Sequence, residues 1–315
     1  MADTTPSPPQ AVHRLSLGQR LKRDKVMLLL TLPGLLYFVV FHYVPLLGYM
    51  VAFQDYQPYL GYMHSAWVGV SNFTSAFADP AFWSATGNTL KIALVQLVFF
   101  FPVPIALALL LNSIVSDKVR RFVQSVVYLP HFIGWVIIVS IFQQILGGAG
   151  VVPDLLGHLG LPRYDMTTDP GAFPWLLTLQ VAWKDAGWGT IIMLAALLNI
   201  DRGLYEASAI DGAGRARRLW HVTLPGISPV IILLLILNLG QILSVGFEQI
   251  LLQRDAVGAD AAEVLDTYVY FHGVLDGQWG PAAAVGLVKG VIGLALILGA
   301  NKLAHRFGHE GIYSK

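Results

Sequence analysis

Six apolar stretches, each long enough to cross a lipid bilayer, constrain this chain more than any other feature. They cover residues 26–52, 83–112, 122–147, 174–200, 226–252 and 281–303. A helix needs about 20 residues to cross the roughly 30 Å of hydrocarbon in a bilayer. Hydrophobic residues fill 55% of positions and charged residues only 12%, about half the share typical of a soluble protein. The sequence therefore predicts an all-α membrane protein with six transmembrane helices.

The basic residues are divided unevenly among the segments that connect these stretches. Five Lys or Arg residues precede residue 26, three lie in 113–121, four in 201–225 and three from Lys302 onward, whereas the three other connections together hold two. Cytoplasmic connections of membrane proteins carry the excess of Lys and Arg. We therefore expect both chain ends to be cytoplasmic. The expected organisation is an N-terminal tail (1–25), a membrane domain (26–303) and a C-terminal tail (304–315).

One connection on this cytoplasmic side, "DRGLYEASAIDGAGRARRLWHVTLP" at 201–225, is polar between two apolar stretches, and we call it the polar insert. Its segment 204–210 favours helix, with Asp201 placed as the N-cap. Gly212 and Gly214 allow the positive φ angles that a tight turn requires. A second short helix is expected to follow and to stop at Pro225.

Two interpretations of the polar insert stay open on physical grounds. It could be a basic connection at the membrane surface, anchored by Trp220 and by its arginines among lipid phosphates. It could instead dock on a cytoplasmic partner, with Glu206 and Asp211 available to basic residues of that partner.

The polar insert resembles the EAA loop of binding-protein-dependent ABC importers, whose pattern is EAA-x3-G-x9-I-x-LP. Glu206-Ala207-Ser208, Gly212 and the run 222–225 (VTLP) match it, with Ser208 in place of the second alanine and Val222 in place of isoleucine. Segments 32–56 and 284–308 are similar to maltose-type carbohydrate permeases, in particular the branch for complex sugars and oligosaccharides. The resemblance covers about residues 26–308.

This resemblance implies the type I ABC importer fold in a bacterial cytoplasmic membrane. It implies a second, homologous permease as heterodimer partner, two cytoplasmic ATP-binding subunits, and an extracytoplasmic solute-binding protein that delivers the sugar. In that family the loop fits a cleft on the ATPase subunit and transmits its closure to the membrane helices. The residues expected in this coupling role are Glu206, Ala207, Asp211, Gly212, Leu224 and Pro225.

The sequence lacks the motifs of an enzyme. A P-loop requires a Gly-Lys pair, and the chain contains no such dipeptide and no cysteine. The zinc-protease motif H-E-x-x-H and the serine-hydrolase motif G-x-S-x-G are also absent. His305 and His309, followed by Glu310, have the spacing of a metal site, but two histidines in a solvated tail are usually only polar. We therefore expect no catalytic activity, cofactor or metal. The resemblance implies protein subunits, sugar and membrane lipids as partners, and no nucleic acid.

Polar side chains in the fifth stretch indicate where a sugar would pass. At 100° per residue, Asn238, Gln241 and Glu248 fall within an arc of about 80°. An uncovered amide or carboxylate costs several kcal/mol in hydrocarbon, so this stripe is expected to face the bundle interior. Phe247 for ring stacking and Lys289 in the last stretch complete the predicted substrate path. Hydrogen bonding of the stripe to the partner permease is the alternative.

Other intramembrane polar groups leave further alternatives open. Lys184 and Asp185 could neutralise each other or belong to an outer gate, and Gln143 and Gln144 are expected to serve helix packing. A self-powered secondary transporter would need ion-binding groups near the membrane midplane, and Glu248 with Lys289 could be assigned that role. The EAA pattern favours the ATP-driven importer.

Overall fold

The computed structural model describes residues 22–306, 308 and 311 and divides into two compact units, Met1–Met50 and Val51–Lys315. Most of the predicted N-terminal tail lies outside the described residues, and so do His309 and Glu310 of the C-terminal tail. The first unit holds α2 (Lys25–Phe38), the π-helical turn η1 (Val39–Tyr43) and most of the 3-10 segment η2 (Val44–Phe53). No residue of α2 or η1 is buried.

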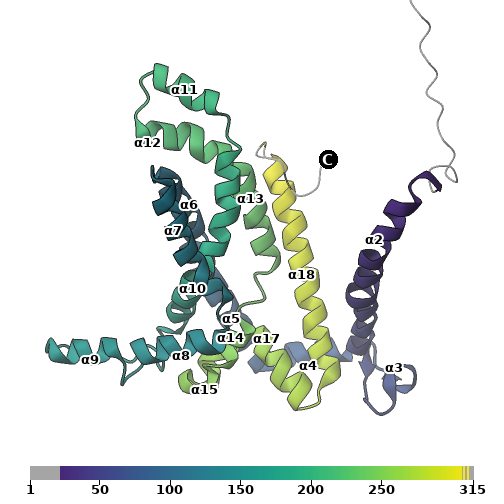
Figure 1. Ribbon diagram of the computed structural model, residues 1–315. Helices are drawn as coiled ribbons and strands as arrows, with labels where there is room; N and C mark the ends of the chain where they lie inside the picture. Colours follow the sequence, from purple (N-terminus) through teal and green to yellow (C-terminus); the bar gives the residue numbers. More distant parts are fainter. Residues whose placement is uncertain (1–21, 307, 309–310, 312–315) are drawn as a thin grey trace, which may run out of the picture. The chain divides into compact units, whose positions relative to one another are not determined.

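The second unit consists mainly of helices (Figure 1), with one short antiparallel pair of strands. Its strands β1 (Gln54–Asp55) and β2 (Ala66–Trp67) pair Gln54 with Trp67 and Asp55 with Ala66. The helices and helical turns are α3 (Gly61–His64), α4 (Ser71–Ala78), α5 (Pro80–Val95), η3 (Gln96–Phe100), α6 (Pro102–Ser113), α7 (Asp117–Tyr128), η4 (Leu129–Phe132), α8 (Trp135–Leu146), α9 (Val151–His158), α10 (Phe173–Leu198), α11 (Arg202–Ile210), α12 (Arg215–Arg218), η5 (Leu219–Thr223), α13 (Leu224–Gly240), α14 (Phe247–Leu251), α15 (Arg254–Val257), α16 (Ala259–Ala262), α17 (Leu265–Tyr268), η6 (Val269–Leu275) and α18 (Trp279–Arg306).

Six helical segments of the described chain are long and apolar enough to cross a membrane. They are Lys25–Phe53, Pro80–Ser113, Trp135–His158, Phe173–Leu198, Arg215–Gly240 and Trp279–Arg306. The predicted number of helical segments of membrane-spanning length is therefore confirmed, although two of the predicted stretches have different courses.

The third predicted stretch, 122–147, is not one continuous helix. α7 ends in the 3-10 turn η4, which contains Pro130, and α8 begins only after Gly134, whose backbone is extended (φ −67°, ψ 153°). Proline has no N–H to donate and its ring crowds the preceding turn, so the helix breaks here. α7 packs on α10, whereas α8 and α9 run crosswise to α10 (Figure 1).

The fifth predicted stretch, 226–252, ends early. α13 stops at Gly240, residues 241–246 form turns, and α14 starts at Phe247. Gly246 has a φ of +44°, which a side-chain-bearing residue rarely adopts. Apolar composition extends through this region, but the helix does not.

Two π-helical turns let helices continue through proline. η3 precedes Pro102 and η5 precedes Pro225. In η3 the N–H of Phe101 donates to the carbonyl of Gln96, a bond one residue longer than in an α-helix. The wider turn gives the proline ring room beside the preceding residues. The prediction that the helix following the glycine turn stops at Pro225 is therefore wrong, because Arg215–Gly240 forms one long helical segment.

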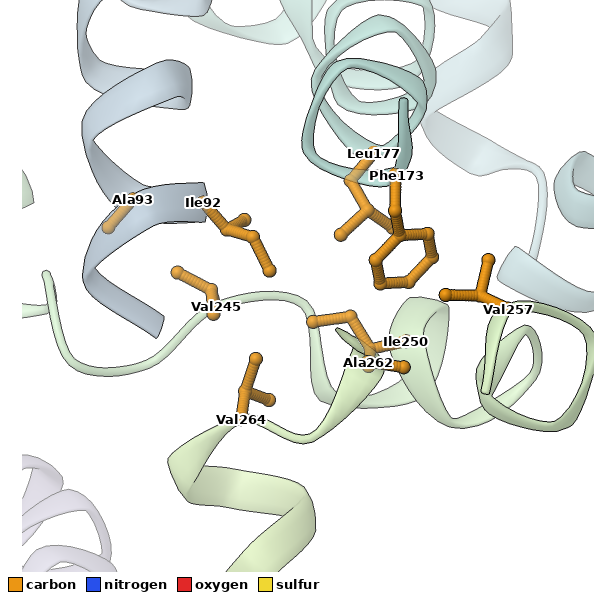
Figure 2. Packing of buried hydrophobic residues seen from close by; sticks show 9 residues of the cluster. All are labelled: Ile92, Ala93, Phe173, Leu177, Val245, Ile250, Val257, Ala262 and Val264. Carbon is orange, nitrogen blue, oxygen red and sulfur yellow. The ribbon is translucent and has the colours of Figure 1, made fainter. Parts of the chain in front are cut away.

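α10 is central to the packing of the second unit. Near its start, Phe173 and Leu177 meet Ile92 and Ala93 of α5 and a group of residues that follow α13 (Figure 2). That group consists of Val245, Ile250, Val257, Ala262 and Val264. Near its end, Met193, Ala196 and Leu197 form a second core with Ala108 of α6 and Ile227 of α13. α10 thus joins two apolar cores at its two ends.

Candidate functional site

The polar insert folds as a helix, a glycine turn and a second helix. The carboxylate of Asp201 caps α11 by accepting from the N–H of Gly203 at 2.9 Å. α11 ends in a Schellman motif, in which Ala213 N–H donates to Ser208 O (2.9 Å) and Gly212 N–H to Ala209 O (3.1 Å). Gly212 has the predicted positive φ, +72°. Gly214 does not, because its φ is −68° and it serves as the N-cap of α12.

Two further side chains, which the sequence did not single out, fix the shape of the polar insert. The hydroxyl of Tyr205 on α11 hydrogen-bonds to Oγ1 of Thr223 in η5 at 3.1 Å. Nε of Arg218 on α12 donates to the carbonyl of Ala213 at 3.1 Å. The first bond ties α11 to the start of the α13 segment, and the second closes the glycine turn. The insert is therefore braced rather than a loose connection.

The outer surface of α11 combines acidic and apolar groups. Glu206, Ala207 and Asp211 are all exposed, as are Leu204 (54% of its surface) and Ile210 (87%). In the part of the chain that the structure describes, neither Glu206 nor Asp211 forms an ion pair. Carboxylates beside exposed aliphatic side chains suit a protein partner with basic groups around an apolar cleft.

The last two residues of the motif lie differently. Leu224 is half-buried and packs against the core that Met193 and Ile227 form. Pro225 occupies the first turn of α13, on its exposed side. These residues therefore belong to the base of the polar insert, where it enters the membrane helices, rather than to its outer surface.

A cavity of about 140 Å³ lies between α5, η3, α10 and the end of α13. Asn238 and Gln241 line it, and both are exposed in this chain. Two polar residues that sequence reasoning missed, Gln96 and Ser244, line it too, together with apolar and aromatic residues. These apolar lining residues are Ala93, Leu97, Phe100, Phe101, Val181, Ile242 and Val245. Amides and a hydroxyl beside aromatic rings are groups that bind sugars.

The predicted polar stripe is only partly present. Because α13 ends at Gly240, counting 100° per residue onward to Glu248 is wrong. Glu248 is exposed on α14 and Phe247 contacts the ring of Tyr270 at 5.5 Å, and neither lines this cavity. Gln96, like Asn238, is a single amide within an apolar stretch of the sequence, so the same reasoning could have predicted that it lines the cavity.

Lys289 is paired. Its ammonium group forms an ion pair with Asp266 of α17, and only 12% of the Lys289 side chain is exposed. A paired, largely buried cation contributes to holding α17 on α18. It does not line the cavity that Asn238 and Gln241 share.

Lys184 and Asp185 each bind the break after α7, and they do so at separate atoms. Nζ of Lys184 donates to the carbonyls of His131 and Ile133, both at 2.7 Å. The carboxylate of Asp185 contacts Nδ1 of His131 at 2.8 Å, and the His131 ring stacks on Trp188. Lys184 therefore satisfies carbonyls that the broken helix leaves without partners. Of the two alternatives for this pair, mutual neutralisation is wrong, because each charged group binds other atoms; a role in an outer gate stays a prediction.

Gln143 and Gln144 do not pack against other helices within the described chain, because both side chains are exposed on α8. They line a second hollow, described below. Among the described residues no group of three or more His, Cys, Asp or Glu could hold a metal ion.

Comparisons with known proteins agree on one family. Residues 100–309 match the model of the family described as binding-protein-dependent transport system inner membrane component. The polygalacturonan/rhamnogalacturonan transport system permease protein YteP of Bacillus subtilis (strain 168) is 45% identical, over 93% of this chain and 92% of its own length. Protein LplB of the same organism is also 45% identical, over 93% and 92%.

Solved structures add the fold. A bacterial alginate ABC transporter, crystallised in complex with an alginate pentasaccharide-bound periplasmic protein, contains a chain that matches with a TM-score of 0.85. The two chains are 36% identical, and the match covers 94% of this chain and 99% of that one.

Proposed function

The chain belongs to the family of binding-protein-dependent transport system inner membrane components, and we propose that it conducts an oligosaccharide inward under the control of its polar insert. It is a permease subunit of a sugar ABC importer, a multi-pass protein of the inner membrane that receives its substrate from a solute-binding protein. It is not catalytic by itself, so ATP is hydrolysed on other subunits. The relatives that bear the names of acidic polysaccharides suggest uronate-containing oligosaccharides as substrates.

One observation carries the proposal for the mechanism. α11 lies between the end of α10 and the start of the segment Arg215–Gly240. Both of these helical segments also line the cavity, α10 through Val181 and α13 through Asn238. A displacement of α11 is therefore applied directly to two walls of the cavity. The Tyr205–Thr223 bond and the Schellman turn stiffen the connection through which the displacement passes.

The exposed surface of α11 is the proposed docking site for an ATP-binding subunit. Glu206 and Asp211 would pair with basic groups there, and Ile210 would enter an apolar cleft. ATP-driven approach of two such subunits would move the two polar inserts of a permease pair toward each other. The membrane helices would then alternate between inward-open and outward-open arrangements.

The distribution of basic residues supports the orientation that this mechanism requires. Arg202, Arg215, Arg217 and Arg218 all lie in the polar insert, and such clusters favour the cytoplasmic side. Both chain ends would then be cytoplasmic as well.

The size of the cavity supports a second permease. Ligand sites usually enclose about 300–1,000 Å³, and the cavity of this chain, about 140 Å³, is smaller. Asn238 and Gln241 are also exposed at its rim. A homologous permease packed against this rim would enlarge the site and cover both amides.

Reconstitution tests the proposed function. The full complex, with the partner permease, ATP-binding subunits and binding protein, is placed in proteoliposomes and supplied with radiolabelled oligogalacturonides. Uptake that requires ATP, and that ionophores leave unchanged, is the expected result. Uptake driven by an ion gradient without ATP would instead identify a secondary transporter.

A further inference from the structure

A second hollow, of about 670 Å³, lies beside α8. One wall consists of Ser140, Gln143 and Gln144 on α8, and the other of Asp165, Thr167 and Thr168 from the segment that leads to α10. A turn of small residues, 147–150 (GGAG), forms its floor. We call this the α8 hollow.

The α8 hollow is located far from the polar insert. α8 packs on Leu176, in the first turn of α10, through Ile138 and Phe142. The polar insert follows the other end of α10, after Leu198, which at 1.5 Å per residue is roughly 33 Å away. If the polar insert is cytoplasmic, as proposed above, the α8 hollow lies at the extracytoplasmic side.

α8 has an apolar face and a polar face. Ile138 and Phe142 are buried on the first. Ser140, Gln143, Gln144 and the following Gly147 recur at helical spacing on the other, where they line the hollow. In the described part of the chain, neither glutamine side-chain amide has a hydrogen-bond partner. Because unpaired amides are costly in hydrocarbon, this face adjoins water or a polar ligand rather than lipid tails.

The backbone leaves no room for a side chain at two positions in the floor of the hollow, Gly147 and Gly150. A Cβ placed on Gly147 would lie 2.5 Å from the carbonyl oxygen of Gln143, and one on Gly150 would lie 2.7 Å from that of Gln144. A Cβ on Gly148 would lie 2.9 Å from Oδ2 of Asp165. Glycine at these positions therefore keeps the turn tight and the hollow open.

The far wall is held by Asp165. Its Oδ1 accepts hydrogen bonds from the N–H and the hydroxyl of Thr167, at 2.8 and 2.6 Å. Partial burial alone would raise the pKa of Asp165, but hydrogen bonds from Thr167, Gly148 and Thr168 outweigh it and lower the pKa below its ordinary value. The carboxylate thus stays ionised at neutral pH, and its hydrogen bonds to Thr167 fix the position of this wall.

We propose that the α8 hollow is a second carbohydrate subsite, which holds one sugar ring of the oligosaccharide before the oligosaccharide enters the cavity lined by Asn238 and Gln241. The proposal rests on the proposed function. Adjacent amides offer both donors and acceptors, which suits the neighbouring hydroxyl groups of a pyranose ring. The volume of the hollow lies within the usual range for ligand sites, about 300–1,000 Å³. The hollow shares no lining residue with the cavity lined by Asn238 and Gln241, so the two are separate subsites. In this proposal an oligosaccharide of several sugars occupies both subsites, whereas a short sugar occupies only one.

Dependence on sugar length tests this subsite. Proteoliposomes with the full complex are given oligogalacturonides of two to six residues, and Gln143→Ala/Gln144→Ala is compared with the wild type. Each lost hydrogen bond is worth about 1 kcal/mol, so loss of both amides is expected to lower uptake of the longer sugars roughly thirtyfold. Uptake of the disaccharide is expected to stay within about twofold. Thr168→Val, on the opposite wall, is expected to give the same length-dependent pattern.

Ile145→Ala is the matched control, because Ile145 is exposed on a different side of α8 and does not line the hollow. Equal losses for all lengths, or no loss, would overturn the subsite. So would weaker capture of the binding protein irrespective of its sugar load, which would assign the hollow to protein docking. Absence of ATP-dependent sugar uptake by the wild-type complex would overturn the proposed function, and the subsite with it.

Discussion

Gly293 of α18 lies against the carbonyl oxygen of Gly240, the last residue of α13. A Cβ added to Gly293 would stand 2.5 Å from that oxygen, a distance at which one helix must move. α13 and α18 therefore make close contact at two glycines, Gly240 and Gly293. The residue that follows Gly240, Gln241, lines the cavity. Gly290, one turn earlier in α18, is not part of this crossing, since a Cβ there would meet nothing within 4 Å.

Gly293→Ala is expected to destabilise this crossing. Overpacking of a tight contact costs about 1–3 kcal/mol, while alanine returns about 1 kcal/mol in helix propensity. The melting temperature of the purified subunit should therefore fall. Gly290→Ala is the control and should leave the melting temperature unchanged or raise it. Equal behaviour of the two variants would mean that the helices do not meet at Gly293.

Gly212→Val is expected to abolish coupling. Its φ of +72° is a left-handed conformation, which costs a residue with a side chain about 1–2 kcal/mol and a β-branched one more. ATP-dependent uptake should be lost while the subunit still inserts into the membrane. Gly214→Ala is the matched control, because its φ is −68° and a Cβ there would meet nothing. Loss of uptake in both variants would contradict a role for the turn geometry.

Glu206→Lys tests the charge of the docking surface. The carboxylate is exposed on α11, and a lysine there is expected to repel basic groups of an ATP-binding subunit. Co-purification of that subunit should weaken by roughly tenfold, since a pair at an interface contributes about 1.5 kcal/mol or more. Retention of normal co-purification and uptake would leave only a lipid-anchoring role for the polar insert.

Asn238→Ala and Gln241→Ala test the substrate path. Both side chains line the inner cavity, and each replacement is expected to lower sugar uptake about three- to tenfold by removing hydrogen bonds to hydroxyl groups. Assembly and basal ATPase activity should be preserved. Glu248→Gln, outside the cavity, serves as the comparison and should transport within about twofold of the wild type. Failure of the alanine variants to assemble would assign the two amides to subunit packing.

Single cysteines test the orientation, because the chain contains none. Arg215→Cys and Ala259→Cys both place a thiol at an exposed position. An impermeant maleimide is expected to label the first only from the cytoplasmic side and the second only from outside. Labelling of both from one side would rule out the six-span arrangement.

Local signals explain what could be predicted from the sequence. The six spans follow from hydropathy, and the cap at Asp201 and the turn at Gly212 depend only on adjacent residues. The end of α13 was missed because apolar residues continue to Leu252 and the break depends on the turn around Gly246. The roles of Lys184 and Lys289 depend on contacts with His131 and Asp266, which are distant in the sequence. Hydropathy registers the cost of such charges but does not identify the group that neutralises them.

The surface of α11 and the lining of the cavity have no residue in common, so the two can change separately in evolution. The outer residues of α11, such as Glu206 and Ile210, are exposed, and within the described part of the chain Tyr205 makes its side-chain hydrogen bond to Thr223 of η5. Substitutions on that outer face can therefore accumulate without disturbing the residues around Asn238, and the reverse also holds. A permease built in this way can change the residues that face its cavity while the surface of α11 stays the same.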